Sequence, residues 1–133
     1  MTLEQDNDLA ALLMDRWLGV DFRGTPYAGL VVRDDTNRPV GCVILNDYSQ
    51  GNIEMTGAGV GCWTPRVIRT IARHIFVTLG CTRVTSRTRA SNKTAREALK
   101  SMGFRREGTA RAWFCDEDAI LYGLLRREQR IVR

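Results

Sequence analysis

A glycine-rich segment leads directly into a helix between residues 57 and 66, where the sequence reads Gly-Ala-Gly-Val-Gly-Cys-Trp-Thr-Pro-Arg. Thr64 is a favoured N-cap residue, and Pro65 is favoured at the first helical position. The first amides of a helix lack helical acceptors and carry the positive end of its dipole, so this junction suits a phosphate. Arg66 and Arg69 add positive charge within one turn. The same pattern also fits a purely structural turn into a helix.

Three other regions carry polar groups that could take part in chemistry. Asn92 begins a short helix, where its side chain is either a simple N-cap or also a ligand contact. The strand expected at Thr82–Thr88 is unusually polar, and its alternation puts Ser86 and Thr88 on one face. Glu54, on an earlier strand, is either a general base for an amine or an ordinary charge at a strand edge. Weaker candidates for acid–base work are Asp47, Tyr48, His74 and Tyr122.

Apolar periodicity predicts elements in the order α-β-β-β-α-β-α-β-β, which indicates an α/β fold with a mixed central sheet and helices on both faces. The expected helices are Asp6–Val20, Thr64–Leu79 and a short helix after Asn92 that Gly103 ends. The expected strands are Ala28–Arg33, Val40–Leu45, Ile53–Val60, Thr82–Thr88, Phe104–Phe114 and Ala119–Leu125.

The spacing of apolar residues also predicts which helix faces are buried. The buried face of the first helix should consist of Leu9, Leu12, Leu13 and Trp17. The buried stripe of the second should consist of Ile68, Ile71, Ala72, Ile75, Phe76 and Leu79.

Length and composition bound the class of protein. The 133 residues, 44% hydrophobic and 26% charged, fit one domain over residues 1–133, with a basic tail at 126–133 that we expect to fray. No apolar run approaches the length of a membrane span, and the N-terminal region is acidic, so we expect a cytoplasmic protein without a membrane partner. The four cysteines lack zinc-ligand spacing, and we expect free thiols and no metal.

The net charge of +5 favours an anionic partner, such as a polyphosphate cofactor, an acidic protein or a nucleic acid. The three tryptophans are scattered rather than interleaved with basic residues. Their distribution argues against nucleic acid, because single strands are bound through aromatic side chains beside basic ones.

The segment Asn92–Gly108 carries Asn-x-x-Ala, then Gly-Phe, then Glu-Gly. It resembles the C-terminal half of the GNAT superfamily, the acyl-CoA-dependent N-acetyltransferases, and the resemblance extends over roughly Val40 to Leu125. The resemblance implies an N-acetyltransferase that moves an acetyl group from acetyl-CoA to an amine by direct attack. The amine acceptor would be a protein or a small molecule. The alternative is a non-catalytic module with a GNAT-like fold that binds acyl-CoA or contacts nucleic acid.

The resemblance also implies roles for individual residues. Glu54 would be the base, and a notch between two splayed strands would hold the acyl group beside Thr56, Ser86 and Thr88. Acetyl-CoA would be bound by Gly61, Trp63, Thr64, Arg66 and Arg69 at the helix start, and by Asn92 and Arg96 on the next helix.

Two departures from the family pattern concern the chemistry. The usual phosphate signature, Arg/Gln-x-x-Gly-x-Gly/Ala, is replaced at residues 61–66 by Gly-Cys-Trp-Thr-Pro-Arg. The tyrosine that many members use as a general acid is replaced by Leu99. The helix-end geometry would still supply backbone donors to phosphate, whereas protonation of the leaving thiolate has no side chain assigned to it.

Overall fold

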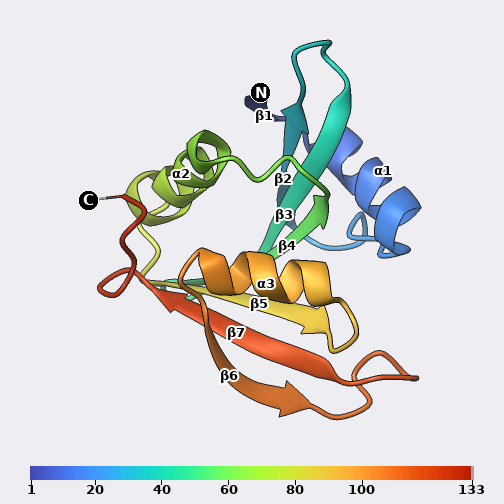
Figure 1. The fold of residues 1–133 in the computed structure, drawn as a ribbon, viewed down its shortest axis with the longest axis vertical. Coiled ribbons are helices and arrows are strands. Elements are labelled where there is room, and N and C mark those ends of the chain that lie inside the picture. The colour runs from blue at the N-terminus through green and yellow to red at the C-terminus, as the bar shows by residue number, and fades with distance from the viewer. Residues whose placement is uncertain (133) are drawn as a thin grey trace.

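The computed structural model describes residues 1–132, in which a seven-stranded sheet has the order β1-β2-β3-β4-β5-β7-β6 (Figure 1). Neighbouring strands are antiparallel except for the parallel pair β4 and β5. The strands are β1 (Thr2–Gln5), β2 (Tyr27–Arg33), β3 (Pro39–Ser49), β4 (Asn52–Gly59), β5 (Arg83–Arg89), β6 (Arg105–Ala110) and β7 (Ala119–Leu125).

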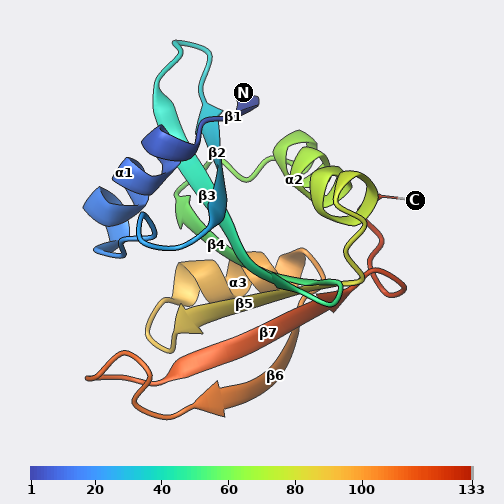
Figure 2. The ribbon, with the colours of Figure 1, turned by 180° about the vertical axis from the view of Figure 1, so that it is seen from behind.

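Three α-helices cover the two faces of the sheet. They are α1 (Asn7–Leu18), α2 (Pro65–Arg73), which continues into the π-helical turn η1 (His74–Thr78), and α3 (Lys93–Ser101). Figure 2 shows α1 on one face and α2 and α3 on the other. The predicted class and the helices on both faces are therefore confirmed, with the short edge strand β1 as the one addition. Within residues 1–132 no helix is both long enough and apolar enough to cross a membrane.

Strands β2 and β3 carry apolar side chains on both faces, which explains their continuous apolar sequences. Val32 and Val43 belong to the core beneath α2 and α3, whereas Val31 and Cys42 belong to the core beneath α1. Residues adjacent in sequence thus serve opposite faces, as the alternation of a strand requires.

The predicted apolar face of helix α1 is confirmed only in part: Leu9 and Leu13 are partly buried and pack against the core beneath this helix. Ala10 and Met14 are fully buried, whereas Leu12 and Trp17 are 40% and 41% exposed. The reason is close packing on β2, because a Cβ atom at Gly29 would lie only 2.5 Å from the Cβ of Ala10. A leucine facing the sheet would not fit in that space.

The helix that begins after Thr64 starts and stops as predicted, but its last turn differs. Thr64 Oγ1 accepts the amide of Val67 at 3.3 Å, and Gly80 follows the helix with a φ of +66°. The π-helical turn changes the spacing near the end of the helix. Phe76 is buried as predicted, whereas Leu79, the last residue of the predicted stripe, is exposed.

The C-terminal tail packs against the core rather than fraying. Val132 is buried, Ile131 contacts the core beneath α2, and Gln129 Oε1 accepts the amides of both residues at 2.9 and 2.8 Å, respectively. Two apolar residues within the basic tail explain the difference from the prediction. Arg133, the last residue of that tail, lies outside the described part of the chain.

We predict that Gly29→Ala lowers the free energy of unfolding by about 1–3 kcal/mol, because the new methyl group overpacks the contact between α1 and β2. Gly24→Ala is the matched control, since a Cβ there has no atom within 4 Å, and its effect should stay within about 0.5 kcal/mol. Urea denaturation measures both. Equal effects would contradict the close packing of α1.

Candidate functional site

Strands β4 and β5 pair only over a short length and then separate. Their parallel register ends at Glu54 and Thr85, although both strands continue beyond those residues. Just beyond this register, Ser86 Oγ still links the two strands, because it donates to the carbonyl of Met55 at 2.9 Å. We call the opening beyond this link the β4–β5 notch.

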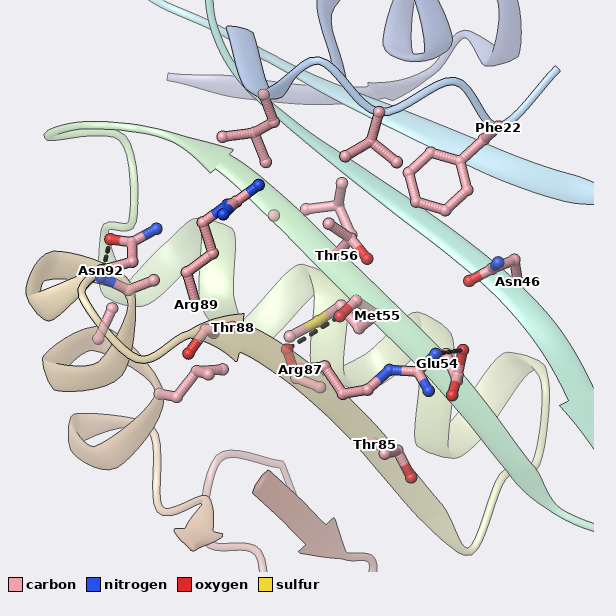
Figure 3. A pocket seen from close by; sticks show the side chains of 18 of the residues that line it. Phe22, Asn46, Glu54, Met55, Thr56, Thr85, Arg87, Thr88, Arg89 and Asn92 are labelled. Carbon is pink, nitrogen blue, oxygen red and sulfur yellow. Dashed lines mark hydrogen bonds and ion pairs between the residues drawn. The ribbon is translucent and has the colours of Figure 1, made fainter. Parts of the chain in front are cut away.

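A cavity of about 600 Å³ occupies the notch. Figure 3 shows side chains from β3, β4, β5, the connection after α1 and the start of α3 around it. The labelled residues are Phe22, Asn46, Glu54, Met55, Thr56, Thr85, Arg87, Thr88, Arg89 and Asn92.

The cavity is lined from both faces of the sheet. Met55 belongs to the core beneath α2 and α3, so the alternation of β4 directs Glu54 and Thr56 to the face of α1. Val84 belongs to that same core, so Ser86 and Thr88 face α3, as their alternation predicted. The three predicted notch residues therefore all line the cavity, with Thr56 on the opposite face from the other two.

Glu54 lies in a cluster of charged side chains on the α1 face. Arg87 Nη2 donates to Glu54 Oε2 at 2.7 Å. Burial raises the pKa of Glu54; the positive charge of Arg87 opposes this rise, and the neighbouring Asp47 adds to it. Asp47 lies in an irregularity of β3 with a φ of +52°. The raised pKa makes Glu54 a stronger proton acceptor than an exposed glutamate.

The predicted phosphate-binding residues lie where β4 leads into α2. Gly61, with a φ of +73°, turns the chain, and Trp63 Nε1 donates to the carbonyl of Gly59 at 3.2 Å. Because Pro65 has no amide proton and the Thr64 side chain caps the amide of Val67, the amide of Arg66 is left without a helical acceptor.

Trp63 also lines the cavity, which connects the helix start to the notch. Arg66 and Arg69 are exposed on α2 and do not line the notch cavity. Arg69 borders a second cavity, of about 500 Å³, between α2 and the C-terminal tail.

Asn92 and Arg96, both predicted to contact a cofactor, lie in different environments. Asn92 Oδ1 accepts the amide of Ala95 at 3.1 Å, and the residue lines the cavity, so its Nδ2 can still serve a ligand. Arg96 instead donates to Tyr122 Oη at 3.1 Å and to the carbonyl of Ala90 at 3.0 Å. These contacts hold part of its guanidinium near β7, and Arg96 does not line the notch cavity, so its contact with a cofactor stays a prediction.

The wall formed by residues 111–118 was missed from the sequence. A strand was expected to continue to Phe114, but β6 ends at Ala110, and Ala112 has a φ of +53°. The resulting loop brings Trp113 and Phe114 to the cavity. The guanidinium of Arg87 lies 4.4 Å from the centroid of the Trp113 ring. The one sequence signal for this loop is the pair Trp113 and Phe114, two adjacent aromatic residues directly before an acidic turn.

Leu99 is buried and lines the cavity from α3. This is the position where the family tyrosine was expected. An apolar side chain there offers no proton to a leaving group.

Comparisons with known proteins support the fold. No protein-family model matches the sequence, and no curated protein sequence matches it. The spermidine/spermine N-acetyltransferase SpeG of Vibrio cholerae, solved with manganese ions, is similar with a TM-score of 0.75 and 15% identity over 93% of this chain and 91% of that chain.

Two further structures are similar over much of the chain. A ribosomal-protein-S5-alanine acetyltransferase of Vibrio fischeri gives a TM-score of 0.68 and 15% identity over 92% of this chain and 71% of that one. A GNAT-family acetyltransferase of Bacillus anthracis gives a TM-score of 0.65 and 16% identity, over 75% of this chain and 67% of that chain. The chain therefore has the GNAT fold.

We predict opposite effects on stability from two hydroxyl deletions on β5. Ser86→Ala should lower the free energy of unfolding by about 1–3 kcal/mol, because the buried Met55 carbonyl loses its donor. Thr88 Oγ1 is buried and has no hydrogen-bond partner among residues 1–132, so Thr88→Val should leave the stability unchanged or raise it. Urea denaturation measures both. A loss in Thr88→Val as large as that in Ser86→Ala would contradict this prediction.

Proposed function

We propose that this protein is an acetyl-CoA-dependent N-acetyltransferase, in which an amine attacks the thioester directly. The observation that carries the proposal is the β4–β5 notch, a cavity that is lined from both faces of the sheet and has a partly buried carboxylate on its wall. A notch of this kind lets a thioester and an amine approach the same point from opposite faces, which supplies proximity and orientation.

The residues on the α2 and α3 face fit the acetyl-CoA substrate. Trp63, Thr64, Arg66 and Arg69, with the turn at Gly61, would hold the pyrophosphate at the start of α2, and Asn92 would bind the pantetheine arm. This assignment rests on the unpaired amide at the helix end and on the exposed arginines beside it.

The backbone of β4 is suited to hold the thioester carbonyl. The carbonyls of Met55 and Gly59 accept hydrogen bonds from Ser86 and Trp63 on the notch side of the strand. By alternation, Gly57 would direct its amide to the same side. An amide that points at the carbonyl oxygen stabilises the negative charge that develops there as the amine attacks. Thr56, Ser86 and Thr88 would then surround the acetyl group.

The acceptor would arrive as an ammonium ion and must lose a proton before its nitrogen can attack. Glu54 would accept that proton directly or through water, and its raised pKa suits this role. The nitrogen then bonds to the carbonyl carbon, the carbon–sulfur bond breaks, and CoA leaves as a thiolate. The nitrogen, which carries one proton too many after the attack, releases that second proton to water or to the thiolate. Because Leu99 is apolar, the thiolate would leave unassisted or take a proton from water.

The experiment that tests this proposal mixes the protein with acetyl-CoA and a panel of primary amines that includes diamines, amino acids and short peptides. We expect thiol release and a matching acetylated product, identified by mass, for at least one amine. Calorimetry with CoA runs in parallel. Binding without any product would favour the non-catalytic alternative, and an absence of CoA binding would overturn the proposal.

We predict that the double variant Arg66→Ala, Arg69→Ala binds CoA about tenfold or more weakly in calorimetry. A hydrogen bond to a charged group contributes about 1.5–3 kcal/mol when desolvated and less when exposed. Arg73→Ala, a change of an exposed arginine at the far end of α2, should leave the affinity unchanged. Unchanged affinity in the double variant would mean that the phosphates bind elsewhere.

We predict that Glu54→Gln lowers kcat about 100-fold or more while the affinity for acetyl-CoA stays the same, because positioned bases contribute about 10²–10⁴-fold. In the unmodified protein kcat/KM should rise with pH as Glu54 loses its proton. Since its pKa is raised, that rise should be centred above the range of an exposed glutamate. Full activity in Glu54→Gln would remove this residue from the mechanism.

A further inference from the structure

We propose that Arg87 is a positioning residue for the candidate base, holding the Glu54 carboxylate ionised and fixed across the notch, and that Trp113 holds Arg87 in turn. The catalytic role of the Arg87–Glu54 ion pair rests on the proposed function. The existence of the ion pair follows from the geometry of the folded chain alone.

The position of the ion pair follows from where the two strands separate. Glu54 and Thr85 form the last backbone register pair of β4 and β5. Two residues further along β5, Arg87 lies on the same face and reaches back to Glu54 Oε2 at 2.7 Å. The side chains of Arg87 and Glu54 are 30% and 20% exposed, respectively. At this depth a charge pair is screened less than on the surface.

The surroundings of Glu54 give Arg87 a specific task. Glu54 is partly buried and has Asp47 as a carboxylate neighbour, and both conditions favour the protonated form. On the other elements around the cavity the charged groups already form pairs. Asp21 binds Arg23 at 2.9 Å, and Arg89 binds Asp116 and Glu117 at 3.2 and 3.3 Å. Among residues 1–132, Arg87 is the cation in contact with Glu54.

Trp113 provides the second support for the guanidinium. Its ring centroid lies 4.4 Å from the Arg87 Cζ atom, a cation–π distance. Arginine suits this arrangement because its planar group can stack on a ring and still donate at its edge. The loop of residues 111–118 thereby acts on the base through Arg87.

The experiment is a carbon-13 NMR titration of the Glu54 side-chain carboxyl in the absence of substrates, with the resonance assigned from the Glu54→Gln spectrum. In Arg87→Met we expect the midpoint to move to higher pH by about one pH unit, because a positive charge within 4–6 Å is lost. Arg87→Lys keeps the charge and should restore most of that difference. Trp113→Leu should move the midpoint in the same direction by a smaller amount.

Arg83→Met is the matched control. Arg83 lies on the same face of β5, does not line the notch cavity, and forms an ion pair with Glu107 of β6. Its loss should leave the Glu54 midpoint unchanged. An equal midpoint in Arg87→Met and the unmodified protein, both shown to be folded by circular dichroism, would overturn the proposal.

Kinetics separate this inference from the proposed function. The acidic limb of kcat/KM should move with the NMR midpoint in Arg87→Met, while the affinity for acetyl-CoA stays constant. A midpoint that moves while the acidic limb does not would overturn the catalytic role of the pair. Because the NMR titration needs no turnover, it gives its answer even if every amine in the panel fails as an acceptor.

Discussion

The early end of pairing between β4 and β5 is the constraint on which the site depends. Two parallel strands that separate leave backbone amides and carbonyls without partners, and buried groups of this kind must be satisfied. Here the Ser86 hydroxyl donates a hydrogen bond to the carbonyl of Met55, and the Trp63 indole N–H donates one to the carbonyl of Gly59. Both partners are side chains, so the separation persists without a ladder, and the stretch of β4 around Gly57 stays open to a ligand.

Small residues allow helices and loops to reach this opening. The close contact between Ala10 and Gly29 seats α1 directly on β2, and the connection that follows α1 brings Phe22 to the cavity. On the other face, a Cβ atom at Gly57 would lie in ordinary contact with the Trp63 ring, at 3.5 Å. The close approach that requires a glycine is therefore the one at Gly29, and it shapes the site by letting α1 lie directly on the sheet.

The local features of this fold could be predicted from the sequence because they depend on neighbouring residues. Thr64 and Asn92 cap their helices through their own side chains, and Gly103 has the positive φ that its place after α3 requires. The class and order of elements followed from such signals. The orientation of the Arg96 side chain could not be predicted in this way, because it depends on a hydrogen bond to Tyr122, which is 26 residues away in sequence.

The residues of the candidate site also fall into two groups: those that local sequence signals predict and those that depend on contacts between distant parts of the chain. Glu54, Ser86 and Thr88 could be found from residue type and strand alternation, which are local properties. The pairing of Arg87 with Glu54 spans 33 residues and arises only because β4 and β5 are neighbours in a parallel register. Trp113 joins them from a loop that the sequence presented as the end of a strand.

Burial and charge act on Glu54 in opposite directions, and this balance suits a base. Burial favours the protonated carboxyl, which cannot accept a proton, whereas full exposure would make it a weak acceptor. The carboxylate of Asp47 pushes toward the first state and the guanidinium of Arg87 toward the second. A partly buried ion pair at the mouth of a notch holds the group between these limits. The notch proposed to admit a thioester would thereby also set the proton affinity of the group that would activate the amine.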